Sequence, residues 1–168
     1  GSDLQRLTTN TTDEYSPVWS PDGTKIAFSS NLSGDYEIHV MDADGSNVVN
    51  LTKTPGIDET PAWSPDGKKI AFTSARGGGL SDLAIWVMNA DGTNQTKLTT
   101  LAGGEIFPNW SPDGTKIAFE KQGSGFQVYV MNANGSNPVN LTAVNGNNNE
   151  REPVWSPDGQ LLAFYRQV

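Results

Sequence analysis

The sequence predicts an all-β fold, a β-propeller, and three observations support this prediction. The pentapeptide Trp-Ser-Pro-Asp-Gly occurs four times, at residues 19–23, 63–67, 110–114 and 155–159. Short apolar runs flank each copy, and Gly, Pro and β-branched residues are too frequent for a solenoid of helical repeats. A period of about 45 residues that is locked to a turn sequence is typical of a propeller blade.

Each repeat is expected to form four antiparallel strands. The first ends at the Ser-Pro-Asp-Gly turn, at residues 17–20, 61–64, 108–111 and 153–156. The second is continuously apolar, as in a sheet buried on both faces, at residues 25–29, 69–73, 116–120 and 161–165. The third is expected at residues 37–41, 84–88 and 127–131. An Asp-Gly or Asn-Gly turn then leads to a fourth strand that ends at residues 50–52, 97–99 and 140–142.

We interpret residues 1–2 as a cloning scar and residues 3–168 as a single propeller domain. Its repeat units are expected at about residues 9–52, 53–99, 100–142 and 143–168, preceded by an N-terminal strand at residues 4–8. The last unit lacks a third and a fourth strand, so the last blade is incomplete. Three arrangements remain open: an excerpt or engineered fragment of a larger propeller, a small closed ring, or half of a ring completed by a second chain. Self-association, with a homodimer favoured, and an excerpt are preferred over the closed ring.

Composition limits the classes of partner. The net charge of −8 argues against nucleic acid, which needs a basic surface, and leaves cations and cationic proteins or peptides compatible. No apolar run is long enough for membrane insertion. The chain has no cysteine, so disulfides, thiolate metal sites and cysteine nucleophiles are excluded.

The repeated unit resembles the TolB-like β-propeller repeat, a relative of WD-repeat blades. The resemblance rests on (acid)-x-x-Pro-x-Trp-Ser-Pro-Asp-Gly, on Ile-Ala-Phe, on Val-Met-(Asn/Asp)-Ala-(Asp/Asn)-Gly and on Leu-Thr, and it covers residues 4–168. The resemblance implies a periplasmic or secreted bacterial protein that binds other envelope proteins. The family also includes propellers that gate serine peptidases.

One acidic residue stands five positions before each tryptophan of the repeat, at Glu14, Asp58, Glu105 and Glu150. These residues enter the innermost strands, so they are expected to ring the mouth of the central channel. A functional interpretation is a ring that binds a cation or a basic peptide. A structural interpretation, which suits an invariant position better, is that each acid accepts hydrogen bonds that tie its blade to the next.

The loops opposite the repeated turns differ between repeats, and a variable surface on a constant scaffold is the expected place for binding. Six residues on this surface are candidates for partner binding: Tyr15, Ile106, Phe107, Arg151 and Glu152 next to the acidic positions, and Arg76 in a glycine-rich loop. Packing under neighbouring loops is the alternative for the aromatic residues. Arg76 precedes three glycines, Gly77–Gly79, and this loop is interpreted either as a lid or as a tolerated insertion.

The tryptophans at the fixed repeat position, Trp19, Trp63, Trp110 and Trp155, are predicted to wedge between adjacent blades as structural core. The single histidine, His39, shares an aromatic packing position with Trp86 and Tyr129, which argues against a catalytic triad or a histidine metal site. We therefore expect no enzyme activity, no metal and no cofactor. The expected function is a non-catalytic module that binds a protein or peptide. The alternatives are a fragment that assembles into a larger ring with no ligand of its own, and the accessory propeller of a hydrolase.

Overall fold

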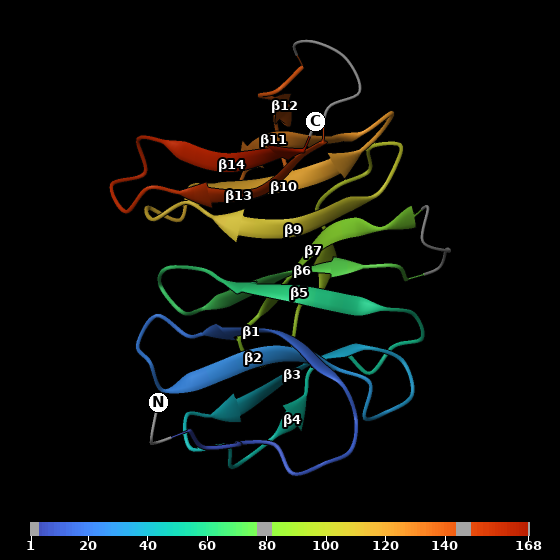
Figure 1. The fold of residues 1–168 in the computed structure, drawn as a ribbon, viewed down its shortest axis with the longest axis vertical. Helices are drawn as coiled ribbons and strands as arrows, with labels where there is room; N and C mark the ends of the chain where they lie inside the picture. Colours follow the sequence, from blue (N-terminus) through green and yellow to red (C-terminus); the bar gives the residue numbers. More distant parts are fainter. Residues whose placement is uncertain (1–3, 77–81, 144–148, 168) are drawn as a thin grey trace.

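The computed structural model describes residues 4–76, 82–143 and 149–167. In this part of the chain the secondary structure is formed by β-strands, which lie in four successive antiparallel sheets stacked along the longest dimension of the molecule (Figure 1). The first sheet contains β1 (Glu14–Trp19), β2 (Lys25–Ser30), β3 (Glu37–Asp42) and β4 (Val49–Asn50). The second contains β5 (Asp58–Trp63), β6 (Lys69–Ser74), β7 (Ala84–Asn89) and β8 (Thr96–Lys97). The third contains β9 (Glu105–Trp110), β10 (Lys116–Gln122), β11 (Phe126–Asn132) and β12 (Val139–Asn140).

The fourth sheet consists of two strands, β13 (Asn149–Trp155) and β14 (Leu162–Gln167). The predicted propeller blades and the incomplete last blade are therefore confirmed. The sheets do not close on themselves, and the first and the last lie at opposite ends of the stack (Figure 1). The small closed ring, one of the arrangements left open by the sequence, is not the structure that this chain forms.

The Ser-Pro-Asp-Gly turn has the same geometry in each sheet. In the first, the Gly23 N–H donates to the Ser20 carbonyl at 2.9 Å, and the Ser20 hydroxyl donates to the Asp22 carboxylate at 2.6 Å. The φ angle of Gly23 is 70°, in the left-handed region that glycine tolerates at low cost. The hydrogen bond from the Ser20 hydroxyl, followed by those from the Thr24 N–H and hydroxyl, lowers the pKa of Asp22 to about 2. The motif is therefore a self-contained turn whose polar groups are already satisfied.

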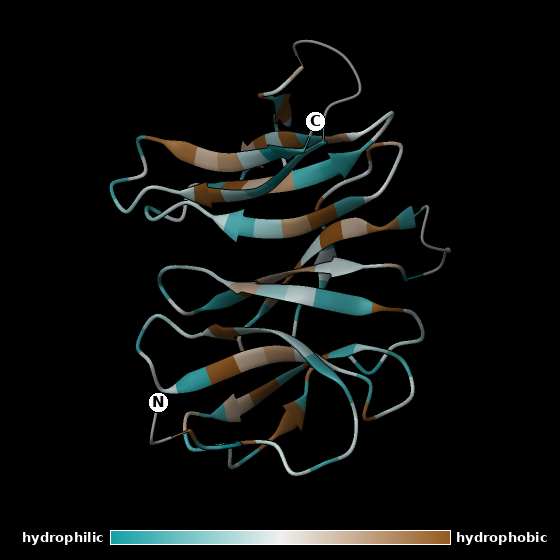
Figure 2. Ribbon diagram, in the orientation of Figure 1, coloured by the Kyte–Doolittle hydropathy of each residue, from teal (hydrophilic) through white to brown (hydrophobic). Residues whose placement is uncertain are grey.

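The core lies between the sheets, where the middle strands face one another. Ala27, Ile38 and Val40 of the first sheet pack against Trp63 and Phe72 of the second. An equivalent cluster joins the second and third sheets. Figure 2 shows apolar residues along the central strands and hydrophilic residues in most of the connecting turns. Burial on both faces of β2, β6 and β10 explains their continuously apolar sequences.

Residues 4–8, for which a strand was expected, form none. The reason is that a strand needs a hydrogen-bonded neighbour, and the sheet that would provide one is absent from this side of the described chain. Leu7 nevertheless packs against the first sheet. The innermost strands also begin earlier than predicted, at or next to the acidic position rather than at the proline.

Candidate functional site

The inner strands carry a repeated backbone irregularity that shapes the concave edge of the stack. In the first, second and fourth sheets, the ladder between the first two strands shifts register just before the proline of the first strand. In the third sheet the register of the same ladder shifts between Ala118 and Glu120 of β10, which pair with Asn109 and Ile106 of β9 on either side of Pro108. The residue that precedes this proline has a positive φ of 51° to 55° in each of the four sheets: Ser16, Thr60, Phe107 and Glu152. A non-glycine residue in this region costs about 1 kcal/mol or more, so the strain must be compensated by neighbouring contacts.

That compensation comes from the preceding sheet. The backbone N–H of Thr60 donates to the Ser29 hydroxyl at 3.2 Å, and the N–H of Phe107 donates to the Thr73 hydroxyl at 3.2 Å. In the fourth sheet, the N–H of Glu152 donates to the Glu120 carboxylate at 2.7 Å. The bulges of the second, third and fourth sheets are thus tied to the second strand of the blade before them.

The bulges line a groove of about 300 Å³ along the concave edge, to which all four sheets contribute. The prolines form its constant part, whereas the residues before them supply a serine, a threonine, a phenylalanine and a glutamate. Two predicted partner-binding residues, Phe107 and Glu152, therefore lie in one groove. Phe107 is 38% exposed, whereas Glu105, two residues before it on the same strand, is buried. The groove presents different side chains on an identical backbone.

The four acidic positions are placed at or near the beginnings of the inner strands, as expected, but they are turned into the protein. Asp58, Glu105 and Glu150 are at most 2% exposed, and Glu14 is partly buried. Thr8 donates to Glu14 at 3.0 Å, and Thr99 donates to Glu105 at 3.0 Å.

Thr8 and Thr99, each the threonine of a Leu-Thr pair, thus bridge the end of one repeat to the start of the next, whereas Thr52 donates to Glu37 of its own sheet. Ion pairs hold the other two acids, from Arg76 to Asp58 at 2.7 Å and from Arg166 to Glu150 at 2.9 Å. Each acid therefore has a partner inside the protein, but the ion pairs of Asp58 and Glu150 each lie within one repeat and do not tie a blade to the next.

Burial raises the pKa of one of the four acidic residues, Glu105, and of two other buried glutamates. It raises the pKa of Glu105 to about 7. The pKa of Glu37 is also raised, by burial and by the nearby Asp58 carboxylate, although the hydrogen bond from Thr52 opposes the shift. Burial likewise raises the pKa of Glu120. A protonated carboxyl group is a poor cation ligand, so the raised pKa of Glu105 favours packing over metal binding at this position below about pH 7.

No group of three histidine, aspartate or glutamate side chains that could hold a metal ion occurs within residues 4–76, 82–143 and 149–167. The same ranges contain no helix long and apolar enough to cross a membrane. His39 is buried and stacks on Phe28, with ring centroids 5.7 Å apart, in the packing position that the sequence indicates.

The other predicted partner residues differ in how far they are free to bind. Tyr15 is 53% exposed and lies 5.6 Å from the ring of Tyr36, centroid to centroid. Arg151 is partly buried, with its guanidinium 3.6 Å from the centroid of Phe126. Ile106 is partly buried.

Arg76 is engaged inside the protein. It pairs with Asp58, donates to Gln95, and stacks over the rings of Phe72 and Trp86 at 5.3 and 5.0 Å from their centroids. The rest of its predicted lid, Gly77–Gly79, lies outside the described residues.

The repeated tryptophans follow the prediction except at the first position. Trp63 is 8% exposed, Trp110 lies in the cluster between the second and third sheets, and the Trp155 indole N–H donates to the Asn109 carbonyl at 3.2 Å. Trp19, in contrast, is 55% exposed. The prediction that each indole wedges between two blades is wrong for Trp19, because no sheet precedes the first one in the described chain.

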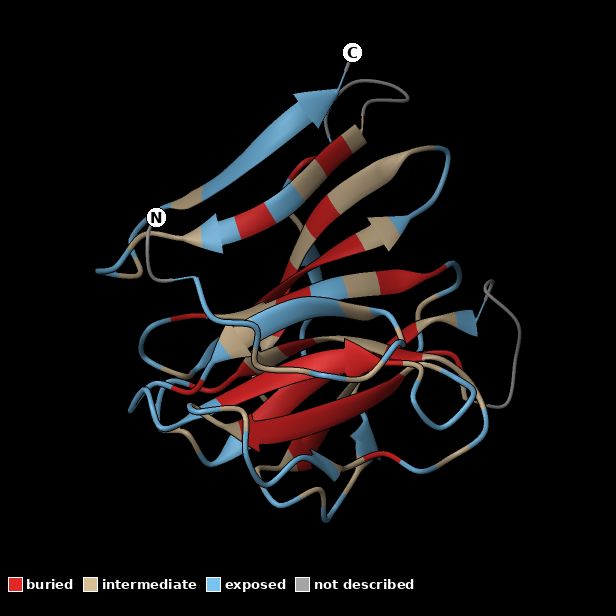
Figure 3. Ribbon diagram, turned by 60° about the horizontal axis from the view of Figure 1, so that its bottom comes forward, coloured by how far each residue is buried: buried red, intermediate tan, exposed pale blue. Residues whose placement is uncertain are grey.

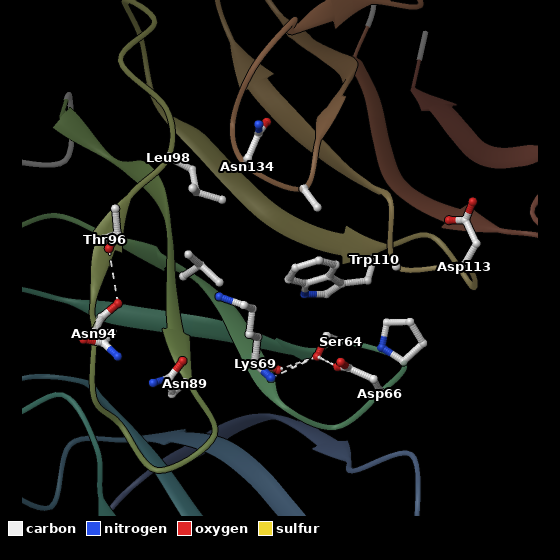
Figure 4. A pocket seen from close by; sticks show the side chains of 14 residues that line it. Ser64, Asp66, Lys69, Asn89, Asn94, Thr96, Leu98, Trp110, Asp113 and Asn134 are labelled. Atoms are coloured by element: carbon white, nitrogen blue, oxygen red, sulfur yellow. Dashed lines mark hydrogen bonds between the residues drawn. The ribbon is translucent and has the colours of Figure 1, made fainter.

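A larger groove, of about 630 Å³, lies away from the bulges, between the repeated turns of the second and third sheets (Figure 4). Trp110, Val87 and Leu98 supply its apolar wall, and Lys69 and Asn89 are among its polar lining. An equivalent groove of about 450 Å³ lies between the first two sheets. Apart from the tryptophans, which were predicted as blade core, sequence reasoning did not single out these residues. One signal was available. In the first sheet Lys25 pairs with Asp42 and forms an ion pair with it, whereas the equivalent Lys69 of the second sheet faces the uncharged Asn89.

The four-stranded antiparallel sheets, stacked face to face with their inner strands along one groove, define an open β-propeller. The TolB beta propeller domain model matches residues 3–82 and again residues 79–168. The chain therefore belongs to the TolB β-propeller family.

Two solved structures of TolB proteins are similar to this chain. Putative TolB from Agrobacterium tumefaciens has 28% sequence identity and a TM-score of 0.76, over 87% of this chain and 51% of that one. TolB from Acinetobacter baumannii has 31% identity and a TM-score of 0.73, over 88% of this chain and 36% of that one. The chain thus spans about half, or less, of the length of these relatives.

A Kuenenia stuttgartiensis hydrazine synthase chain has a TM-score of 0.77, over 98% of this chain and 30% of that one, but its identity of 17% shows a shared fold alone. The comparison with curated proteins found no significant match.

Proposed function

We propose that this propeller is a non-catalytic interaction module that binds a protein or peptide on the concave edge and the adjoining variable loops. The observation that carries the proposal is the groove formed by the four bulges, in which side chains differ while the backbone is constant. Loops and irregular positions held by a rigid scaffold are the usual carriers of recognition. The family resemblance to TolB implies envelope-protein partners and a periplasmic or secreted location.

The charge of the chain favours a basic partner. With a net charge of −8, the protein attracts cationic peptides over a distance of about 10 Å at moderate salt. Glu152 lies in the groove, and Tyr15 lies next to the groove-lining Ser16. The same groove contains the exposed aromatic ring of Phe107, and a groove with an aromatic ring and a carboxylate suits a peptide that carries both an apolar residue and a Lys or Arg.

Selection of peptides from a displayed library tests this proposal. The most enriched peptides are expected to carry basic residues and to lose at least about tenfold in affinity for the Phe107→Ala and Glu152→Gln variants. The matched control is Val139→Ala, since Val139 is also an exposed apolar residue, at 54%, but lies on an outer strand. Selected peptides that bind both groove variants as tightly as the parent, or no enrichment at all, would contradict the proposal.

Assembly into a larger ring is a second candidate function, and one observation favours it. The outward sides of the first and last sheets expose large apolar residues, with Trp19 at 55% and Tyr165 at 46%. Sedimentation of the 168-residue chain at several concentrations is expected to show a dimer that dissociates on dilution. A monomer at every concentration would contradict this candidate.

A further inference from the structure

Neighbouring sheets pack through two different surfaces, which we name by chain order. The leading face of a sheet packs against the sheet before it, and the trailing face packs against the sheet after it. In the first interface the trailing face contributes Ala27, Ile38 and Val40, and the leading face contributes Trp63 and Phe72. The second interface joins Ala71 and Ile85 to Ile117, Phe119 and Met131 at equivalent positions. The interface is thus heterologous and repeats within the chain.

The two ends of the stack leave one copy of each surface open. On the leading face of the first sheet, Trp19 is 55% exposed, whereas its equivalent Trp63 is 8% exposed. On the trailing face of the last sheet, Ala163 is exposed, whereas its equivalents Ala27 and Ala71 are fully buried. Figure 3 shows β14, beside the C-terminus, as an exposed strand. The open surfaces are therefore the two halves of the interface that already recurs inside the chain.

Tyr165 is a second residue of the last sheet that is exposed although its equivalents in the other sheets are buried. Its equivalents Ser29, Thr73 and Glu120 are at most 2% exposed, and each accepts the bulge N–H of the next sheet. Tyr165 is 46% exposed. The residue that corresponds to the donors of those bonds is Ser16, which has the same positive φ. Ser16 and Tyr165 thus hold the two halves of a contact that three internal pairs complete.

The N-terminal segment shows what the leading face is prepared to receive. A Cβ on Gly45 would lie 2.7 Å from the Leu7 carbonyl oxygen, as a Cβ on Gly92 would lie 3.1 Å from that of Leu51. Leu51 ends the outermost part of the blade before Gly92, so Leu7 occupies the same place in front of the first sheet. Between this segment and the first sheet remains a groove of about 170 Å³, lined by Leu7, Phe28 and His39. The N-terminal segment thus takes the place of the outer part of a preceding blade. The place of that blade's inner part, next to Trp19, is uncovered.

The last sheet supplies that inner part, because it consists of an innermost and a second strand. We propose that two copies of this chain associate head to tail, with the trailing face of the last sheet of one copy on the leading face of the first sheet of the other. Ala163 and Tyr165 then lie against Trp19 and Ser16 of the second copy, in the relative position of the first and second sheets. This inference rests on the proposed assembly and names the surfaces that form it.

Mixed cysteine variants test the inference, because the natural chain has no cysteine. Ser16→Cys and Tyr165→Cys are prepared separately and mixed in a glutathione redox buffer. A head-to-tail contact places the two cysteines at disulfide distance only in the mixture, whereas a contact between identical faces links one variant with itself. The internal control is the double variant Ser29→Cys with Thr60→Cys, the equivalent pair within one chain, which is expected to form an intramolecular disulfide.

The dissociation constant supplies a second measurement. Trp19→Glu is expected to raise it at least about tenfold, while Val139→Glu, at an exposed position on an outer strand, leaves it unchanged. Dimers without the mixed cross-link and without an effect of Trp19→Glu would overturn the head-to-tail contact and leave assembly standing. A chain that is monomeric at every concentration would overturn both.

Discussion

Individual glycines in the Asp/Asn-Gly turns do more than permit a turn. Gly135 has a φ of 86°, and a Cβ built on it would lie 2.7 Å from the Leu98 carbonyl oxygen of the preceding blade. The residue therefore meets two separate requirements, a left-handed backbone and close contact with a neighbouring chain segment. The same contact recurs at Gly45 and Gly92.

Replacement of Gly135 by alanine is expected to lower the free energy of unfolding by about 2 kcal/mol or more, because strain and overlap both increase. Chemical denaturation of the variant measures this loss. Gly123→Ala is the matched control, since the nearest atom to its Cβ lies 3.8 Å away and its φ is outside the left-handed region. The control is expected to change the value by no more than about 0.5 kcal/mol. Equal effects of the two substitutions would contradict this account.

Glu105 is expected to make stability depend on pH. Its folded-state pKa of about 7 lies above the value of 4.5 for an unperturbed glutamate, because the side chain is buried. As the pH rises from about 4.5 to about 7, the unfolded chain releases this proton first. Ionisation therefore favours unfolding, by up to about 3 kcal/mol above pH 7.

The Glu105→Gln variant removes this titration. Its free energy of unfolding relative to the parent is expected to increase steadily between pH 5 and pH 8, as measured by urea denaturation at a series of pH values. Curves for parent and variant that run parallel over this range would show that Glu105 is not the titrating group.

At the level of strands and sheets, the inter-blade contact combines apolar packing with one directed hydrogen bond. Thr73 illustrates this combination. It is 2% exposed, accepts the Phe107 N–H and forms a 2.6 Å hydrogen bond with the Thr60 hydroxyl. It therefore holds the bulges of two successive sheets.

Thr73→Val keeps the shape of the side chain and removes both hydrogen bonds. The partly buried Phe107 N–H and the Thr60 hydroxyl then lack this partner, so the free energy of unfolding is expected to fall by about 1–3 kcal/mol. Thr96→Val serves as the control, because the hydroxyl of Thr96 is exposed. Thermal or urea denaturation of both variants checks the difference. A loss at Thr96 as large as that at Thr73 would mean that the β-branched side chain, and not the hydrogen bond, matters.

For the whole molecule, charge opposes the association that the end faces favour. Two copies with a net charge of −8 each repel one another, and salt screens this repulsion. The dimer dissociation constant is therefore expected to fall as the sodium chloride concentration increases from low to physiological values, as measured by sedimentation equilibrium. Weaker association at higher salt would indicate an interface held by ion pairs instead of apolar packing.

Much of this architecture could be predicted from residues alone because it is local. The Ser-Pro-Asp-Gly turn satisfies its own polar groups, so its sequence is sufficient to recognise it in each repeat. The continuously apolar second strands, such as Ile26–Phe28, revealed sheets buried on both sides. Measured from the tryptophan, the acidic position and the start of the inner strand were found within a few residues. These features depend on contacts close in sequence, or on contacts that every repeat shares.

Other features depend on which repeats become neighbours in space, and local patterns do not contain that information. The Trp19 side chain has the same local sequence as that of Trp63, yet one is exposed and the other buried, because burial requires a preceding sheet. Residues 4–8 resemble a fourth strand but form none without a partner. The pairing of Arg76 with Asp58 and the strained φ of Phe107 arise from contacts between separate segments. Repetition determines what one blade is, and only packing between blades determines which surfaces stay open to bind.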